Sequence, residues 1–419
     1  MQESDFTENK PGRLVRTLSG HWAFAPNVLP PALRLNWSLV HLLSKADRAL
    51  GELAGLGRTL PNPYLLIRPF IRREAVLSSK IEGTQASLSD LVLFEISRGT
   101  PSRSQSLPDD VREVSNYVTA LETGLDRVNQ LPLSLRLLRE LHNLLMAGVR
   151  GGQFTPGEFR RVQNWIGPPE SPIENASYVP PPVDEMNAAL HAFEAFLHSK
   201  QEIPPLIRLA LVHYQFEAIH PFLDRNGRIG RLLLSLTLCL EKLLPHPLLY
   251  LSAYFEKHRT QYYQRLLDVS QKGKWEEWIA FFLDGVAEQS LDAIWRAGEL
   301  LRLRVKFRNT LPSARASTLL LRMVDDLFDY PAVTIQHTAK HLEITARAAG
   351  LNIAKLQNAG ILEETTGRER YRTFACRPIL EVIDMERPSP TDPSQLDQSA
   401  ERLGTNALLE KRDLPIQSQ

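Results

Sequence analysis

The side chains best suited to chemistry lie together in the stretch HPFLDRNGRIGR, which runs from His220 to Arg231. Apolar segments bound this polar stretch on both sides. Pro221 is expected to end the helix before it, and the Asn-Gly pair is typical of a turn. A second, apolar helix should therefore begin at about Gly227, where its free amides and its dipole would favour an anion.

The charged residues of this stretch suit phosphate chemistry. Arg228 and Arg231 are three positions apart, so they share one face of the second helix. Asp224 could hold a metal ion, and His220 could act as a base. The combination predicts a phosphate site with a general base beside it. The alternative is a polar turn between two core helices, with Asp224 as a helix cap and the arginines in solvent.

Helices must position these residues, because helical spacing of apolar residues dominates the chain. The segment 165–182 differs, since its proline, serine and asparagine residues exclude a helix and favour a short hairpin or an extended flap. The pattern therefore predicts an all-α fold. The expected helices, two of which should stop at glycines near 57 and 83, are 39–57, 60–83, 134–146, 183–198, 205–220 and 275–307.

Overall charge excludes little and supports no particular partner. The 419 residues carry 49 Lys and Arg against 48 Asp and Glu, which gives no support for a nucleic-acid or membrane partner. Cys239 and Cys376 have neither disulfide nor metal-ligand spacing, which favours a reducing cytoplasm. The N-terminus is too polar for a signal peptide. The most apolar stretch, 231–244, includes Glu241 and Lys242 and is expected to be a buried helix.

The C-terminal part of the chain has its own pattern. From about Ser313, three short helical segments are followed by the polar hairpin EETTGRERYRTFAC, which is the order of a winged helix-turn-helix. Arg347 and Lys355 would lie on its recognition helix, and Arg368, Arg370 and Arg372 on its wing. These cations could meet a DNA backbone, but nearby acidic residues offset them. A unit for protein interaction or dimerisation is the alternative.

The stretch HPFLDRNGRIGR resembles the signature of the Fic family, HPFx[D/E]GNGRxxR, at eleven of its twelve positions. The resemblance implies a helical Fic core with a short β-hairpin flap, and transfer of AMP from ATP to a protein hydroxyl. It implies that His220 deprotonates the target, that Asp224 binds Mg²⁺ and that Arg231 holds the γ-phosphate. The implied nucleotide-binding set is Asp224, Arg225, Asn226, Gly227, Arg228, Gly230, Arg231, Tyr262 and Tyr263.

Arg225 departs from the family pattern, which has glycine there. If the position needs a positive φ, arginine costs about 1 kcal/mol relative to glycine. If the backbone must approach a phosphate, the side chain has to point away, or it adds a cation to the site. A different transferred group, such as phosphate or another nucleotide, stays an alternative for this reason.

A second motif, SSKIEG, covers residues 78–83. Ser78 and Glu82 are four apart on one helix face. By itself this is a helix end closed by Gly83, with Glu82 in solvent. The motif also resembles [S/T]xxxE[G/N], which accompanies Fic domains. That resemblance implies that Glu82 pairs with Arg231 and blocks the γ-phosphate; the same carboxylate could instead orient a water that removes AMP from a modified target.

Two further segments resemble parts of Fic proteins. EFRRVQNWIG resembles the flap that aligns the target, which implies roles for Asn164, Trp165, Ile166 and Gly167; an ordinary surface hairpin with Trp165 buried is the alternative. Tyr262 and Tyr263 fall where related proteins contact the nucleobase, although plain core aromatics fit their spacing equally well.

These features predict four regions: an N-terminal Fic-associated helical region with the inhibitory motif (1–105), a catalytic core (106–300), a winged helix-turn-helix (313–383) and a disordered tail (386–419). The leading function is a protein adenylyltransferase restrained by Glu82. Its substrates would be ATP with Mg²⁺ and a protein hydroxyl, which could be its own; DNA and a second copy of the chain are further candidate partners, and a membrane is not. The alternative is a DNA-binding regulator that senses nucleotide without turnover.

Overall fold

The computed structural model describes residues 1–60, 62–97, 109–128, 130–149, 154–168, 171–311, 317–367 and 371–388. These residues are mostly helical, which confirms the predicted all-α class. The expected boundary between residues 105 and 106, the start of the winged helix at 313 and residues 389–419 of the expected tail lie outside the described residues.

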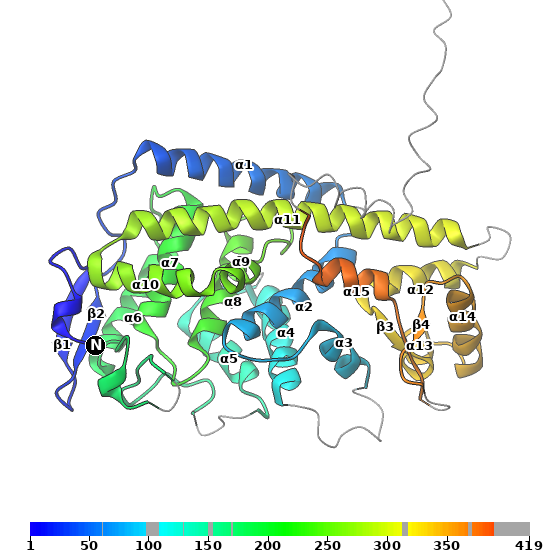
Figure 1. Cartoon of the computed structure of the whole chain (residues 1–419), viewed down its shortest axis with the longest axis horizontal. Helices are drawn as coiled ribbons and strands as arrows, with labels where there is room; N and C mark the ends of the chain where they lie inside the picture. Colours follow the sequence, from blue (N-terminus) through cyan, green and yellow to red (C-terminus); the bar gives the residue numbers. More distant parts are fainter. Residues whose placement is uncertain are drawn as a thin grey trace, which may run out of the picture.

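The part of the chain before residue 311 is mainly a set of packed helices. α1 (Trp37–Thr59) lies along the longest helix, α11 (Trp275–Thr310), as Figure 1 shows. α1 runs through the glycines that were expected to end it and stops at Thr59. The remaining helices of this part are α2 (Tyr64–Ile81), α3 (Leu88–Ser97), α4 (Asp109–Val128), α5 (Leu135–Leu145), α6 (Val183–His198), α7 (Pro205–Ile219), α8 (Asn226–Leu240), α9 (Ser252–Lys257) and α10 (Arg259–Lys272).

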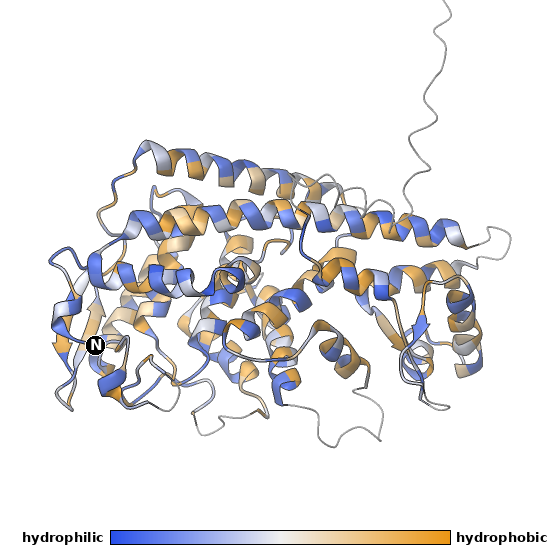
Figure 2. Ribbon diagram, viewed as in Figure 1, coloured by the Kyte–Doolittle hydropathy of each residue, from blue (hydrophilic) through white to orange (hydrophobic). Residues whose placement is uncertain are grey.

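The core sits around α7 and α8, which carry the predicted site between them. Nearly every residue of α7 is buried. On α8, every residue from Asn226 to Leu238 except Gly227 is buried as well. In Figure 2, α7 is drawn mainly in the colours of apolar residues, whereas α10 on the outside is mostly hydrophilic. Such all-round apolar helices pack in the centre of a fold because no face can be left in water. None of the described helices combines the length and the apolar content that a membrane span needs.

An N-terminal hairpin was not predicted from the sequence. β1 (Gly12–Arg16) and β2 (Trp22–Pro26) pair antiparallel, with Leu14 opposite Phe24. Phe24 is buried, and its amide donates to Val179 O at 2.9 Å. The hairpin therefore contacts the segment 165–182 that was expected to form the flap. Its strands are five residues long, which is too short for period-two alternation to stand out among helical patterns.

The C-terminal unit has the predicted order. It contains α12 (Thr318–Asp329), α13 (Ile335–His341), α14 (Ala346–Asn358) and a three-stranded sheet in the order β3 (Ala332–Thr334), β5 (Thr373–Ala375) and β4 (Glu363–Glu364). A final helix, α15 (Arg377–Asp384), then packs against α11 and α2.

The winged helix is held firmly against α2 and α11. Arg72, buried on α2, donates to the Asp329 carbonyl at 2.6 Å and pairs with Glu95 at 2.8 Å. Arg296 on α11 is fully buried and donates to the carbonyls of Val382 and Ile383. Charged hydrogen bonds of this kind fix the position of the C-terminal unit on α2 and α11. Glu82 caps the C-terminal end of α2.

Candidate active site

The predicted base lies at the end of α7. His220 takes a left-handed conformation (φ 50°, ψ 60°), and its amide still donates to Phe216 O at 3.0 Å. Its ring Nδ1 lies 3.3 Å from Glu217 O. A proton on Nδ1 would bond to that carbonyl and leave Nε2 as an acceptor. Burial lowers the pKa of His220 to about 4, so the ring is neutral at pH 7 and able to accept a proton.

The loop between α7 and α8 is closed by Asn226. Its side-chain oxygen accepts from Phe222 N at 2.8 Å, and its Nδ2 donates to Phe222 O at 2.8 Å. This side chain therefore fixes the loop conformation, and the backbone amides at the start of α8 supply the anion site. α8 begins at Asn226, in agreement with the expected start at about Gly227.

Gly227 and Gly230 are needed for two different contacts. A Cβ on Gly227 would lie 2.5 Å from Glu82 Oε1 and 2.8 Å from Arg231 Nη1, so this glycine leaves room for the ionic groups. A Cβ on Gly230 would lie 2.2 Å from Glu217 Oε1. Gly230 therefore faces Glu217 on α7, and its contact with nucleotide stays a prediction.

The two sequence motifs meet at Arg231. Glu82, the C-cap of α2, accepts from Arg231 Nη2 at 2.6 Å and from Arg228 Nε at 3.1 Å. Arg231 also donates from Nε to Ser78 Oγ at 2.8 Å. The alternative in which Glu82 and the arginines are solvated is wrong. Burial by itself would raise the pKa of Glu82, but Arg231 and Arg228 outweigh it and hold that pKa below its ordinary value.

The Arg225 side chain points into the protein. Its backbone has a positive φ of 59°, the geometry that favours the glycine of the family pattern. Its guanidinium donates to Glu113 on α4 at 2.9 Å (Nη2 to Oε1) and 3.3 Å (Nη1 to Oε2), and Arg228 Nη1 donates to the same carboxylate at 3.0 Å. A direct contact between Arg225 and nucleotide, which the resemblance implied, is not what this arrangement supports.

Asp224 lies at the edge of the site, with 39% of its side chain exposed. Its Oδ1 accepts from Arg225 N at 2.7 Å. Among the described residues no group of three or more His, Cys, Asp or Glu side chains could hold a metal ion. A single accessible carboxylate nevertheless fits Mg²⁺, which proteins commonly bind through one or two carboxylates together with substrate phosphates and water.

The flap is attached to the loop by buried polar side chains. Arg160 is 1% exposed, and it donates to the carbonyls of His220 (3.0 Å), Val162 (3.3 Å) and Pro181 (2.5 Å). Asn164 Nδ2 donates to Phe222 O at 2.8 Å. These hydrogen bonds therefore attach the flap to the loop that carries His220.

The outer part of the flap is extended rather than a full hairpin. Ile166 and Tyr178 form one antiparallel bridge, with Ile166 N donating to Tyr178 O at 2.8 Å. Trp165 is 41% exposed, so the alternative in which it is buried is wrong. Trp165, Ile166 and Gly167 are exposed, but the backbone of Ile166 is already bonded to Ser177 and Tyr178, so an extended segment of another protein could pair with the backbone of its two neighbours.

Tyr262 and Tyr263 are adjacent in the sequence but differ in burial. Tyr262 is 1% exposed, its hydroxyl lies 2.8 Å from His213 Nε2, and its ring stacks on Phe255. It is a core residue, as the alternative had it. Tyr263 is 43% exposed and stays available for a nucleobase contact.

Sequence reasoning missed three buried side chains around the loop: Arg160, Glu113 and His142. His142 on α5 accepts from Gly157 N at 3.0 Å, and its Nε2 lies 3.2 Å from Asp224 O. Its place on the apolar face of the segment 134–146 was a usable signal, because a polar residue there must be buried. No comparable signal separates Arg160 from its exposed neighbour Arg161.

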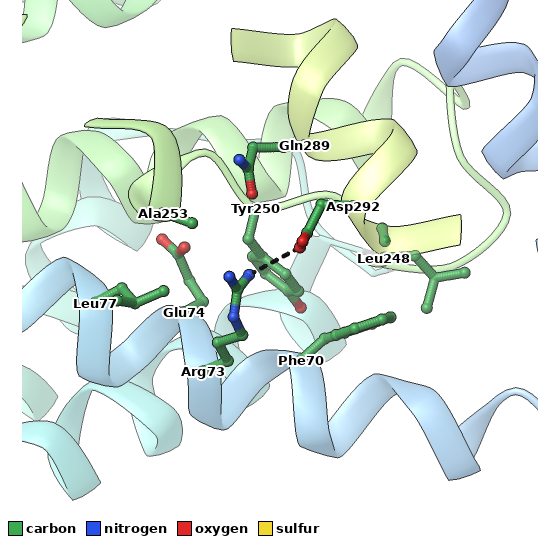
Figure 3. Close-up of a pocket in the computed structure, with 10 residues that line it drawn as sticks. Phe70, Arg73, Glu74, Leu77, Leu248, Tyr250, Ala253, Gln289 and Asp292 are labelled. Atoms are coloured by element: carbon green, nitrogen blue, oxygen red, sulfur yellow. Dashed lines mark hydrogen bonds and ion pairs between the residues drawn. The ribbon is translucent and has the colours of Figure 1, made fainter. Parts of the chain in front are cut away.

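A buried polar cluster lies on α2 one turn before Ser78. Glu74 accepts from Ser252 Oγ at 2.6 Å and from Tyr117 OH at 3.2 Å, and burial raises its pKa to about 7. Figure 3 shows the neighbouring cavity, in which Arg73 points toward Asp292. The cavity measures about 10 Å³, room for one water at most. The cluster therefore supports α2 and is no nucleotide site.

The winged helix exposes three of its predicted cations. Arg347 and Lys355 lie at the surface of α14, and Arg372 is exposed before β5. Arg368 and Arg370 lie outside the described residues. The exposed positions fit a surface that meets a partner.

Fold and site together define a helical protein with an anion site at a helix start, a neutral histidine beside it and a carboxylate from a second helix on its arginines. Three family models match the chain: Fic/DOC family N-terminal over residues 40–126, Fic/DOC family over 132–238, and HTH DNA binding domain over 320–375. Residues 40–238 of the chain therefore match the N-terminal and main parts of the Fic/DOC family.

Relatives with a named activity match about two fifths of the chain. A protein adenylyltransferase Fic from Drosophila grimshawi is 31% identical over 176 residues, which are 41% of this chain and 32% of that protein. Its counterpart from Aedes aegypti is 31% identical over 171 residues, 40% of this chain and 30% of that protein. The chain thus spans about a third of the length of these relatives.

A solved structure shares the fold over most of the chain. A Fic family protein from Desulfovibrio desulfuricans G20 superposes with a TM-score of 0.54 and 18% identity, covering 83% of this chain and 98% of that one. The likeness concerns the fold alone.

Proposed function

We propose that the protein transfers AMP from ATP to a hydroxyl group of a protein. The observation that carries the proposal is the neutral His220 placed directly before the anion-binding start of α8. Two relatives that match about two fifths of the chain are named protein adenylyltransferases, which agrees with this chemistry.

In the proposed reaction, the phosphates of ATP lie on the amides at the start of α8 and on Arg228, with the γ-phosphate on Arg231. Nε2 of His220 takes the proton of the target hydroxyl, whose oxygen forms a bond to the α-phosphorus. The bond from that phosphorus to the β-phosphate oxygen breaks, and pyrophosphate leaves. Mg²⁺ held by Asp224 and the phosphates would neutralise charge on the leaving group. The surface backbone of the flap would align the target.

We further propose that Glu82 restrains this reaction. Its carboxylate lies 2.6 Å from Arg231 Nη2 and 3.1 Å from Arg228 Nε, so a γ-phosphate must displace it to reach Arg231. An arginine whose guanidinium already donates to a carboxylate is not free for phosphate. The same carboxylate could orient a water for removal of AMP from a modified target, which is the reverse use of one site.

The test compares wild type with Glu82→Gly. Both are incubated with Mg²⁺ and ATP labelled at the α-phosphate, and then with ATP labelled at the γ-phosphate. We expect protein labelling by the variant from the α-label and not from the γ-label, and mass spectrometry should show an added AMP. Label from the γ-phosphate would mean transfer of phosphate and would reject the proposal.

Glu241→Gly is the matched control. Glu241 is also the C-cap of its helix, α8, and it also pairs with an arginine, Arg208. We expect this variant to label no more than wild type, because its carboxylate lies at the far end of α8. Equal labelling by both variants would show that loss of any helix cap activates the protein, and the restraint by Glu82 would be rejected.

A second proposed function concerns the winged helix. We propose that it binds DNA, on the basis of the exposed Arg347, Lys355 and Arg372 and of the match to a DNA-binding helix-turn-helix family. If the catalytic segment only senses nucleotide, DNA protection in a footprint should respond to ATP while no label is transferred. A footprint without any protected sequence would favour a protein partner, including a second copy of this chain.

The free Cys239 and Cys376 agree with a reducing compartment such as the cytoplasm.

A further inference from the structure

Arg225 is an unfavourable choice for its backbone position. Its φ of 59° and ψ of 23° lie in the left-handed region, where a residue with a Cβ is strained and glycine is not. Its side chain is buried, with contacts to Glu113 and to Met146 Sδ. A strained conformation that also buries a guanidinium needs a compensating interaction, and the carboxylate of Glu113 supplies it.

Glu113 is shared between two arginines. It accepts from Arg225 Nη2 at 2.9 Å and from Arg228 Nη1 at 3.0 Å, and it lies on α4, more than a hundred positions from both in the sequence. The resulting cluster alternates in charge along Arg225, Glu113, Arg228, Glu82 and Arg231. Each of the five side chains has an ionic partner within the cluster.

The charge of this cluster explains what Arg225 adds. Three arginines and two glutamates carry a net charge of +1, which becomes +2 when Glu82 leaves Arg228 and Arg231. With glycine in place of Arg225, the same departure would leave only +1, because Glu113 would neutralise Arg228 alone. The site would then attract a polyphosphate less strongly.

We infer that Arg225 is a positioning residue for nucleotide binding, acting through Glu113. It neutralises the carboxylate that positions Arg228, so Arg228 keeps a fixed orientation and its charge acts on the phosphates. This inference rests on the proposed function, because it takes ATP as the ligand of the α8 site. It assigns a gain in affinity to the residue that departs from the family pattern.

The experiment measures ATP affinity by calorimetry in the Glu82→Gly protein, without any transfer readout. We expect Arg225→Gly to weaken binding about tenfold, the effect of one charge at roughly 10 Å in a medium of intermediate dielectric. Adding Glu113→Gln should restore most of that loss, since it removes the uncompensated carboxylate. Arg225→Lys keeps the charge but loses the bidentate contact with Glu113, so it should lose less affinity than Arg225→Gly.

Lys242→Gly is the matched control. Lys242 also has a positive φ, of 55°, and also carries one positive charge, but it follows the C-terminal end of α8 and is exposed. Its removal should leave ATP affinity unchanged. Thermal unfolding of each variant shows whether the protein is folded, so that a loss of binding is not a loss of structure.

Three outcomes would overturn the inference: equal ATP affinity in Arg225→Gly and its parent, no recovery on adding Glu113→Gln, or an equal loss in Arg225→Lys. A parent that binds ATP but labels no protein would reject adenylyl transfer and leave these binding comparisons valid. A parent that binds no ATP would overturn the inference together with the proposed function.

Discussion

The first turns of α8 and the C-terminal winged helix both carry cationic side chains, but they present them in opposite ways. On α8, Arg228 and Arg231 are buried, and Glu82 and Glu113 from other segments hold them. On the winged helix, Arg347 and Lys355 are exposed at the surface of α14. Buried ion pairs place charges with high precision, whereas exposed cations act at longer range and are screened by salt.

This difference in burial predicts that substitutions at the start of α8 affect catalysis, whereas substitutions on the winged helix affect binding. Removal of one member of a buried pair leaves an uncompensated charge, so its effects are large and specific to one step. Removal of an exposed cation changes affinity modestly and in a salt-dependent manner. The predictions below test this contrast, from the largest expected effect to the smallest.

The largest effect is expected at the base. His220→Ala in the Glu82→Gly protein should lower the rate of AMP transfer about a thousandfold, because general bases commonly contribute between a hundredfold and ten-thousandfold. The rate is measured from labelling in a single turnover at saturating ATP. ATP affinity, measured separately, should change little, since the phosphates are held by α8 and its arginines. A rate within tenfold of the parent would contradict the role of His220.

A smaller but clear effect should follow loss of the buried arginine under the flap. Arg160→Ala removes a donor from three carbonyls, of which that of Pro181 is buried and those of His220 and Val162 are partly buried, and it should lower the free energy of unfolding by about 3 kcal/mol. Arg161→Ala, one position along and exposed, should change it by less than about 0.5 kcal/mol. Urea unfolding of both variants makes the comparison, and equal stabilities would show that the two neighbours are equivalent.

The winged helix should respond weakly to loss of single charges. Arg347→Ala and Lys355→Ala should each weaken DNA binding a few-fold and reduce the slope of log affinity against log salt by about 1. Lys200→Ala removes an exposed charge from the catalytic segment and serves as the control. An unchanged salt slope in the double winged-helix variant would indicate that this surface faces a protein.

The smallest effect is expected from pH. His220 acts as a base only when it is neutral, and its neutral fraction rises as the pH rises through its pKa. Because burial lowers that pKa to about 4, labelling by Glu82→Gly should change by less than about twofold between pH 8 and pH 6. It should fall only as the pH approaches the folded pKa. A midpoint near pH 6.5 would show that the ring is solvated and would weaken the contrast between the two regions.

Local signals in the sequence determined several boundaries of the structure. Pro221 and the Asn-Gly pair ended α7 and started α8 within a residue of the expected places, and Gly83 follows the end of α2. The order of the winged helix was readable in the same way. These features depend on the conformational preferences of neighbouring residues, which act before any tertiary contact forms. The juxtaposition of Glu82 and Arg231 was available only through the resemblance to the Fic family.

Tertiary structure alone decided which charged and aromatic side chains are buried and with what they pair. Arg225 reaches Glu113, Arg160 is enclosed while Arg161 is exposed, and Tyr262 is in the core while Tyr263 is outside. Each outcome depends on a group that is distant in the sequence, and adjacent residues have the same local propensities. Burial of a charge is favourable only when its partner arrives from another element, so no local pattern could predict it.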